Sequence, residues 1–323
     1  MSRPLEAMTL VAADPGGVLR VNGKTYRGQA EVLRDRTGLT VVNRLGLEAY
    51  LLGVVSAEMG RRNSAEQTAL RAQAIVSRTY ALRNLRRWRS QGFDLYATVS
   101  DQAYGGVNAE TPEGRAAVTE TRGSVLTHNG SLIEAFYYST CGGRTADGFE
   151  VFRGASRPYL RSVSDVAGNG VAYCRISPRY RWREEWTGEA LRAGLQRHSP
   201  EVAARGRGSI GEIADIRVTQ RSASGRVDQL AIRVGGSEVL VNGHFNIRQA
   251  LRPSAVDLLR STAFTLVATG AGKKVTHLVA EGMGAGHGVG LCQWGAVSRA
   301  RAGQGYEQIL AAYYPGTRVE RRY

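Results

Sequence analysis

Cysteine is scarce in this chain, and no short motif surrounds the cysteines that are present. Three of the 323 residues are cysteines, Cys141, Cys174 and Cys292, and no two of them form a C-x-x-C pair. A structural zinc site therefore has no support in the sequence, and we expect neither a metal nor another cofactor. Cys141 and Cys174 can pair if the compartment oxidises thiols. Cys292 would then be a small buried residue or a free thiol.

Long apolar runs are also missing. No run reaches the roughly 18 residues typical of a membrane-spanning helix, so we expect none. The start, MSRPLEAMTLVAADPG, lacks the basic segment leading into an apolar one that marks a signal peptide. Two alternatives follow: a trimmed mature chain or an intracellular protein. A membrane tether would have to come from a segment that precedes this sequence.

Acidic residues are outnumbered by basic ones. The chain has 43 Lys+Arg against 28 Asp+Glu, a net charge of +15. Such a charge attracts nucleic acid, anionic lipid or an anionic cell-wall polymer. Zinc-finger spacing and an aromatic RNA-binding strand are absent, so nucleic acid is the weakest of these. The glycine-rich run 282–290, GMGAGHGVG, fits neither a dinucleotide fingerprint nor a phosphate loop.

The residues that are present predict an α+β fold, with mixed helices and strands. Residues 1–44 read as short strands forming a small β platform, with Asn22-Gly23 as a hairpin turn. Residues 45–180 are expected to form the first part of a core that residues 271–323 complete. Residues 181–270 read as an inserted smaller α+β lobe, helical over 181–198 and then stranded.

The stretch Leu45–Leu82 predicts two helices joined by a polar turn. The first runs from about Leu47 to Ala57, and the second begins with a capping box of Ser64 and Gln67. A basic run, Arg83, Arg86, Arg87 and Arg89, is expected to extend the second helix, with a solvated helix face as its alternative reading.

Glu58 stands at the end of the first helix among apolar residues. Apolar surroundings and a helix C-terminus both disfavour the ionised carboxylate, so we expect a raised pKa suited to a general acid. The alternative is an ordinary solvated helix-end residue. Glu48 is the rival acid of this stretch, but it sits in the first helical turn, where the helix dipole favours ionisation.

Several ordered motifs resemble the SpoIID/LytB family of sporulation proteins and amidase enhancers. The first helix carries L-E-x-Y-L-x-G-V-V followed by Glu58-Met59, and the second carries A-L-x-A-Q-A-x-x-x-R-T-Y-A. Three later stretches are similar to the family as well: residues 101–106 (DQAYGG), 138–145 (YSTCGGRT) and 286–296 (GHGVGLCQWGA). In many members a Cys and a His-Cys pair precede the Gln-x-Tyr and can hold zinc. Tyr96, Ser100 and Asp101 stand nearby here, so we expect no metal there.

The resemblance implies a lytic transglycosylase that cleaves peptidoglycan glycan strands. One carboxyl group, Glu58, would protonate the glycosidic oxygen, and its conjugate base would then activate the sugar's own 6-hydroxyl to close a 1,6-anhydro ring. Arg78 would help catalysis by binding sugar or lactyl groups or by stabilising developing negative charge. The expected substrate contacts are Gln102, Tyr104, Ser139, Thr140, Gly142, Gly143, Arg144, His287, Gln293 and Trp294.

Two of these residues have readings of their own. His287 is the one side chain of its glycine-rich stretch that can exchange protons near neutral pH, and its alternative is a hydrogen-bonded structural histidine. Trp294 is either a sugar-stacking platform or a core aromatic residue.

Two alternatives to the enzyme stay open. One is a non-catalytic cell-wall-binding enhancer of an amidase, with that amidase as partner. The other is a basic nucleic-acid-binding protein, which predicts a steep salt dependence of duplex affinity and no role for Glu58. The resemblance also implies an exported protein, periplasmic or cell-wall associated, and so favours the trimmed chain.

Overall fold

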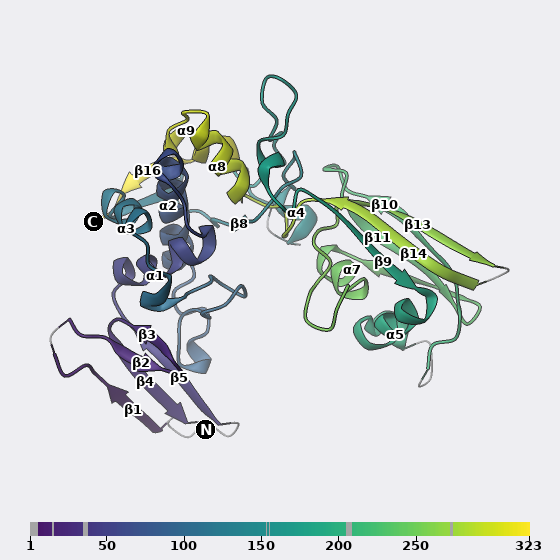
Figure 1. The fold of residues 1–323 in the computed structure, drawn as a ribbon, viewed down its shortest axis with the longest axis horizontal. Coiled ribbons are helices and arrows are strands. Elements are labelled where there is room, and N and C mark those ends of the chain that lie inside the picture. The colour runs from purple at the N-terminus through teal and green to yellow at the C-terminus, as the bar shows by residue number, and fades with distance from the viewer. Residues whose placement is uncertain are drawn as a thin grey trace. The chain divides into compact units, whose positions relative to one another are not determined.

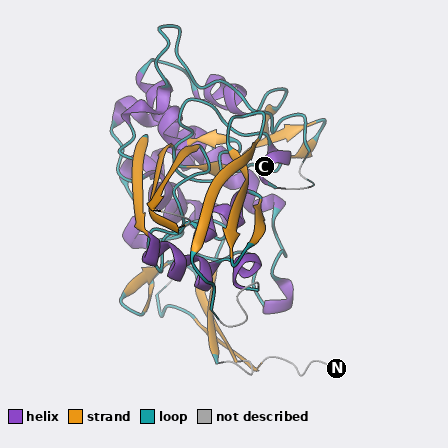
Figure 2. Ribbon diagram, turned by 90° about the vertical axis from the view of Figure 1, so that its right-hand side faces the viewer, coloured by secondary structure: helices purple, strands orange, loops and turns teal. Residues whose placement is uncertain are grey.

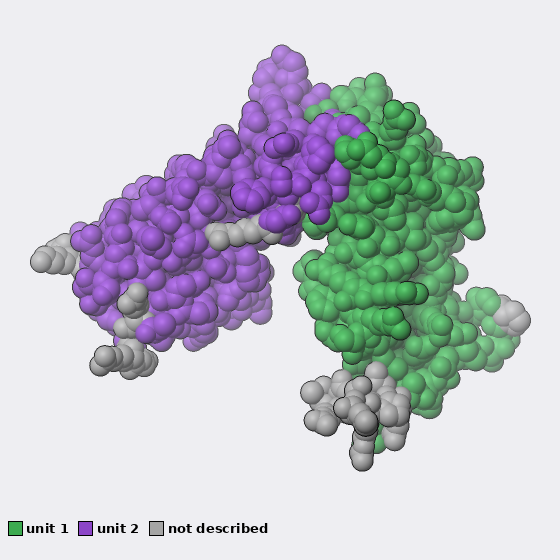
Figure 3. Space-filling model, turned by 180° about the vertical axis from the view of Figure 1, so that it is seen from behind, with its two compact units in different colours: residues 1–136, 299–311, 317–323 green, residues 137–298, 312–316 purple. Residues whose placement is uncertain are grey.

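The computed structural model describes residues 6–14, 16–34, 38–152, 154, 156–204, 209–271 and 274–323. These residues form two compact units, which are described separately (Figure 3). Unit 1 comprises residues 1–136, 299–311 and 317–323, and unit 2 comprises residues 137–298 and 312–316. Both helices and strands run through the described chain, so the predicted α+β class is confirmed (Figure 2).

Unit 1 begins with short antiparallel strands, as predicted (Figure 1). Strand β4 pairs with both β1 and β5, while β2 and β3 form a separate hairpin. Asn22 and Gly23 turn that hairpin with φ values of 47° and 78°, the left-handed backbone that Asn-Gly adopts readily. The predicted hairpin turn is therefore confirmed. The bounds are β1 Glu6–Leu10, β2 Leu19–Val21, β3 Lys24–Tyr26, β4 Gln29–Arg34 and β5 Leu39–Arg44.

The two predicted helices are α1, Leu47–Met59, and α2, Gln67–Arg83, with a 3₁₀ turn η1, Ser64–Glu66, before α2. The predicted capping box is wrong by one residue. Asn63 accepts a hydrogen bond from the Ala65 amide, and Glu66 accepts one from the Asn63 amide. Asn caps a helix as well as Ser does, and Glu66 stands at the matching third position.

The basic run does not extend α2, contrary to the prediction. The helix ends at Arg83, and Arg86 has a φ of 67°, which a continuing helix does not allow. The arginines that follow lie in exposed turns around η2, Arg89–Gln91. The alternative reading, a solvated helix face, is right about the exposure of these side chains, but all except Arg83 lie outside the helix.

The rest of unit 1 packs around α1 and α2. Helix α3 begins where Thr111 accepts a hydrogen bond of 3.0 Å from the Gly114 amide, with Pro112 at its first position. Strand β6 pairs with β7 and with the C-terminal strand β16. Val54, Val55 and Ile75 have no exposed surface and belong to the core. The bounds are η3 Gly106–Ala109, α3 Pro112–Glu120, β6 Ser124–His128, β7 Ser131–Leu132 and β16 Arg318–Arg321.

Unit 2 contains the residues that were predicted as an inserted lobe. Two three-stranded antiparallel sheets, β10-β11-β12 and β13-β14-β9, enclose a hydrophobic cluster with α5 and α7. The helix expected over 181–198 is wrong in its first half, because β9 occupies Arg181–Thr187 and α5 only Gly188–His198. Trp182 and Trp186 alternate with exposed residues along β9 and are buried in the cluster, which is the period of a strand.

Short elements complete unit 2. Strands β8 and β15 pair in parallel, and α8 follows β15 directly. The division between the units runs through α8 and α9. Every helix among the described residues falls short of the length or apolar character needed to cross a membrane. The bounds are β8 Tyr137–Tyr138, α4 Gly148–Val151, η4 Tyr173–Ile176, α6 Pro200–Ala203, β10 Ile213–Arg221, β11 Val227–Val234, β12 Ser237–Asn242, α7 His244–Ala250, β13 Phe264–Ala271, β14 Lys274–Met283, β15 Leu291–Cys292, α8 Gln293–Arg301 and α9 Tyr306–Tyr313.

Candidate functional site

Glu58 lies in the last turn of α1 and is half-buried. One oxygen of its carboxyl group accepts a hydrogen bond of 2.6 Å from the Ala103 amide, which belongs to the DQAYGG stretch. Burial raises the pKa of the Tyr50 phenol, and the nearby charge of Glu58 raises it further. The Tyr50 hydroxyl donates to the Gln102 side chain at 3.3 Å. Two of the motifs singled out in the sequence thus meet at this carboxyl group.

Tyr104 joins the same group from the DQAYGG stretch. Its ring lies 5.1 Å from that of Tyr50, and its hydroxyl donates to Asn43 at 2.7 Å. A Cβ atom at Gly53 would overlap the Tyr104 ring, so glycine at this position of α1 lets the ring pack against the helix. Gln102 is fully buried, so its side chain is not open to a sugar within this unit, and it accepts the hydrogen bond from Tyr50.

Arg78 is not exposed, as a residue that contacts substrate would have to be. Its side chain has no exposed surface and forms a two-pronged ion pair with Glu48, at 2.7 and 2.8 Å. Further donors of the guanidinium reach the backbone carbonyls of Val118 and Ser124. We therefore assign Arg78 a structural role instead of the predicted contact with sugar or lactyl groups.

Glu48 is ionised, as its place in the first turn of α1 predicts. Burial alone would raise its pKa, but hydrogen bonds from Arg78 and from the Tyr323 hydroxyl outweigh that effect, so the pKa lies below its usual range. A carboxyl group that stays ionised cannot donate a proton near neutral pH. Glu48 is therefore unsuited to the role of a general acid.

A hydrogen-bond network around Asp101 holds the segment that precedes Gln102. The buried Asp101 carboxylate accepts hydrogen bonds from the Tyr80 hydroxyl, the Trp88 indole and the Tyr96 amide, at 2.8 to 2.9 Å. Arg87 adds a charged contact at 3.1 Å. One carboxylate thereby connects the end of α2 to the segment that leads to Gln102.

The other predicted contacts belong to unit 2. Thr140 is buried and its hydroxyl lies 2.7 Å from that of Ser177, so a sugar cannot reach it within this unit. The Gly143 amide donates to the Cys141 sulfur at 3.3 Å and is not an open donor. Gln293 is buried, whereas Arg144 is exposed. Ser139, Gly142, Gly143 and Trp294 are partly exposed.

His287 is held by backbone groups on both ring nitrogens. Nε2 lies 2.8 Å from the Tyr137 carbonyl and Nδ1 accepts from the Val289 amide at 3.1 Å, which together define the neutral ring with its proton on Nε2. Burial lowers the pKa of His287 to about 4. A pKa this far below neutrality argues against proton exchange near neutral pH, one of the two readings that the sequence left open. The alternative reading as a structural histidine fits the contacts.

This lowered pKa predicts acid sensitivity. The unfolded chain binds the proton near the ordinary pKa of 6.5, and the folded chain only near 4, so stability falls as the pH drops through that window. At pH 5 the loss attributable to His287 is about 2 kcal/mol. Urea unfolding at pH 7 and pH 5 measures it, because H287Q should lose less stability than the wild type by that amount.

His244 makes a second contribution to the acid sensitivity, which H287Q leaves in place. Burial also lowers its pKa well below the ordinary value, so part of the acid sensitivity persists in H287Q. Equal losses of stability in wild type and H287Q between pH 7 and pH 5 would contradict the prediction.

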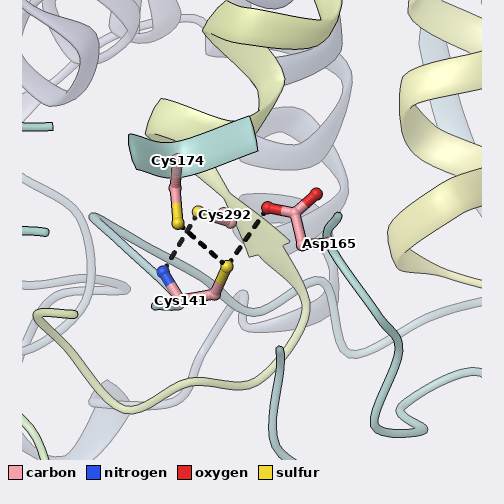
Figure 4. Close-up of side chains that lie close together, drawn as sticks. All are labelled: Cys141, Asp165, Cys174 and Cys292. Carbon is pink, nitrogen blue, oxygen red and sulfur yellow. Dashed lines mark hydrogen bonds between the residues drawn. The ribbon is translucent and has the colours of Figure 1, made fainter. Parts of the chain in front are cut away.

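A group of side chains that the sequence did not reveal lies in unit 2. Cys141, Asp165, Cys174 and Cys292 place one possible ligand atom each within 4.8 Å of all the others, and all four are buried (Figure 4). The cysteines are free, with 3.3 Å between the sulfurs of Cys141 and Cys174. The sequence separations are too long for a recognisable ligand motif, and Asp165 carried no signal at all.

Comparison with known proteins gives matches over most of the chain. A family model described as stage II sporulation protein (SpoIID) matches residues 35–128, and a domain of unknown function (DUF8618) matches residues 170–290. The chain is 31% identical over 301 residues to an uncharacterized protein of Brachyspira hyodysenteriae, covering 93% of this chain and 73% of that one.

Two relatives from Bacillus subtilis carry descriptive names. The chain is 27% identical over 299 residues to its stage II sporulation protein D, covering 88% of this chain and 77% of the relative. It is 28% identical over 290 residues to its amidase enhancer, covering 83% of this chain but only 40% of the relative. The similarity thus extends through residues of both units.

Proposed function

Because the chain belongs to the SpoIID family, we propose that it is a peptidoglycan lytic transglycosylase, with Glu58 as its single acid and base. Membership relates the chain to the bacterial cell wall, since relatives are named for sporulation and for enhancing an amidase. The finer proposal is that the chain cleaves glycan strands and leaves a 1,6-anhydro sugar. It includes export to the periplasm or the cell wall, where this substrate lies.

The observation that carries the proposal is the seating of Glu58. The Ala103 amide donates to its carboxyl group at 2.6 Å, the Tyr50 phenol feels the charge of that group, and Tyr104 packs against Tyr50 in the same unit. The carboxyl group is half-buried, so it is accessible and also partly shielded from water. A positioned carboxyl group with two aromatic side chains in the same part of the unit suits a sugar ring.

The mechanism needs one carboxyl group because the substrate supplies the nucleophile. Protonated Glu58 donates its proton to the glycosidic oxygen as the bond to the anomeric carbon breaks. The resulting carboxylate then takes the proton of the 6-hydroxyl, whose oxygen bonds to the anomeric carbon. An intramolecular nucleophile of this kind is worth several kcal/mol of the barrier through orientation alone. Glycosidases that hydrolyse instead use a second carboxylate.

A digest of purified glycan strands tests the proposal. Strands with and without stem peptides are incubated with the full chain, and the products are analysed by mass spectrometry. Products lighter by one water than the hydrolysis products support the transglycosylase. Products of hydrolysis, or no cleavage of either substrate by a folded protein, would reject it.

The second candidate function is an enhancer of a cell-wall amidase that binds glycan without cleaving it. The named amidase enhancer among the relatives favours it, and so does the net charge of +15, which suits an anionic wall polymer. Binding to purified walls, with no new reducing or anhydro ends but with faster release of peptides by an added amidase, would distinguish this function.

A further inference from the structure

The four buried side chains of unit 2 come from segments far apart in the sequence. Cys141 follows β8, Cys292 ends β15, Cys174 lies in η4, and Asp165 belongs to the loop between α4 and η4 (Figure 4). The exposed fraction is 2% for Cys141 and 0% for each of the others. Thiols are often buried, but a carboxyl group buried this completely needs hydrogen bonds, a charged partner or a metal ion.

The nearest ligand atoms lie slightly closer together than they would around a small tetrahedral ion. Thiolates bound to Zn²⁺ at about 2.3 Å and at tetrahedral angles are separated by about 3.8 Å. Here the Cys141 sulfur lies 3.3 Å from the Cys174 sulfur and 3.1 Å from Asp165 Oδ2, and all four ligand atoms lie within 4.8 Å of one another. The Cys141 and Cys174 sulfurs would have to move apart from 3.3 Å by about 0.5 Å to reach the spacing of a zinc-bound pair.

Backbone amides are aimed at the sulfurs. The Cys141 amide donates to the Cys292 sulfur at 3.2 Å, the Gly143 amide to the Cys141 sulfur at 3.3 Å, and the Gly295 amide to the Cys292 sulfur at 3.3 Å. Such donors favour the thiolate, the form that binds a metal. Cys292 also stands directly before α8, where the helix dipole favours negative charge.

Asp165 is oriented as a ligand with support behind it. Its Oδ2 faces Cys141, while Oδ1 accepts a hydrogen bond of 2.9 Å from the Tyr313 hydroxyl. A second partner on the far oxygen is how carboxylate ligands are usually held. A Cβ atom at Gly295 would overlap both the Asp165 carboxylate and the Tyr313 hydroxyl, so glycine at this position lets α8 approach the group.

We propose that Cys141, Cys174, Cys292 and Asp165 bind a structural Zn²⁺ ion in unit 2. Four protein ligands close the coordination sphere, which marks a structural ion and not a catalytic one. Each thiol that binds releases its proton to solvent. The ion would fasten the 139–144 loop to the start of α8, and so hold Ser139, Arg144 and Trp294 in fixed positions.

Metal analysis of the full chain tests this site independently of any activity on glycan. The protein is reduced, stripped with a chelator, supplied with Zn²⁺ alone and passed through a desalting column. We expect about one Zn²⁺ per chain, protection of the three thiols from a thiol reagent, and a higher melting temperature than that of the stripped protein.

Matched variants assign the ligands. C174S and D165N should bind Zn²⁺ at least tenfold more weakly, and Y313F should weaken it by about tenfold through the outer contact. D257N, which changes an exposed aspartate of the same unit, should bind like the wild type. If C174S does not fold, Y313F and the wild-type measurement still decide.

Three results would overturn the proposal. One is a reduced, folded wild type that takes up no Zn²⁺ and keeps three reactive thiols. The second is equal Zn²⁺ binding by the wild type and a folded C174S. The third is a Cys141–Cys174 disulfide in the isolated protein whose reduction does not lead to Zn²⁺ uptake.

Discussion

Replacement of Glu58 by glutamine is expected to lower the rate of glycan cleavage by about 10²- to 10⁴-fold, the usual contribution of a positioned general acid. Glutamine has nearly the same shape, and its side-chain oxygen can still accept the hydrogen bond from the Ala103 amide, which is 2.6 Å long in the wild type. It cannot give a proton to the glycosidic oxygen or take one from the 6-hydroxyl. The loss should therefore appear in the turnover rate and not in binding to glycan.

The matched control is E307Q, which removes an exposed carboxyl group from the first turn of α9 in the same unit. Its rate of product formation and its melting temperature should equal those of the wild type. Cleavage rates are measured by mass spectrometry of anhydro products, and calorimetry verifies that E58Q is folded. Full activity of a folded E58Q would show that another group supplies the proton.

The local features of the fold could be predicted from the sequence. Asn22-Gly23 turns a hairpin and Thr111-Pro112 starts a helix because the required backbone angles and caps are properties of those residues themselves. The position of Glu58 at the end of the first helix was also predicted correctly. Misplaced boundaries arose where two local signals competed, as at Asn63 and Ser64, which are equally good helix caps.

Features that depend on tertiary contacts could not be predicted in the same way. The helical reading of 181–187 failed because Trp182 and Trp186 are buried against strands of unit 2, and burial of two large rings outweighs a weak helix propensity. The cluster of thiols in unit 2 brings Cys141 next to Cys292, which lies 151 positions later in the sequence. The resemblance placed Arg78 in the family motif, but only the packing of α2 against its neighbours showed that its side chain is buried.

The largest loss of stability is expected when Arg78 is replaced by methionine. Methionine fills much of the volume but leaves Glu48, whose side chain is only 18% exposed, without its charged partner. Breaking a buried ion pair by removing one member costs about 3–5 kcal/mol. The change also leaves the Val118 and Ser124 carbonyls without their guanidinium donors. Calorimetric unfolding of R78M should therefore show a large fall in melting temperature.

The comparison with R71M separates this effect from the loss of any arginine on α2. Arg71 pairs with Glu120 at 2.5 Å, but the two side chains are 32% and 46% exposed, so R71M should cost less than about 1 kcal/mol. The double variant E48Q/R78M should recover part of the loss, because the uncompensated charge is then gone. Equal melting temperatures of R78M and R71M would contradict a stabilising role for the ion pair between Arg78 and Glu48. If R78M instead kept its stability and lost glycan binding, Arg78 would have the substrate role first predicted for it.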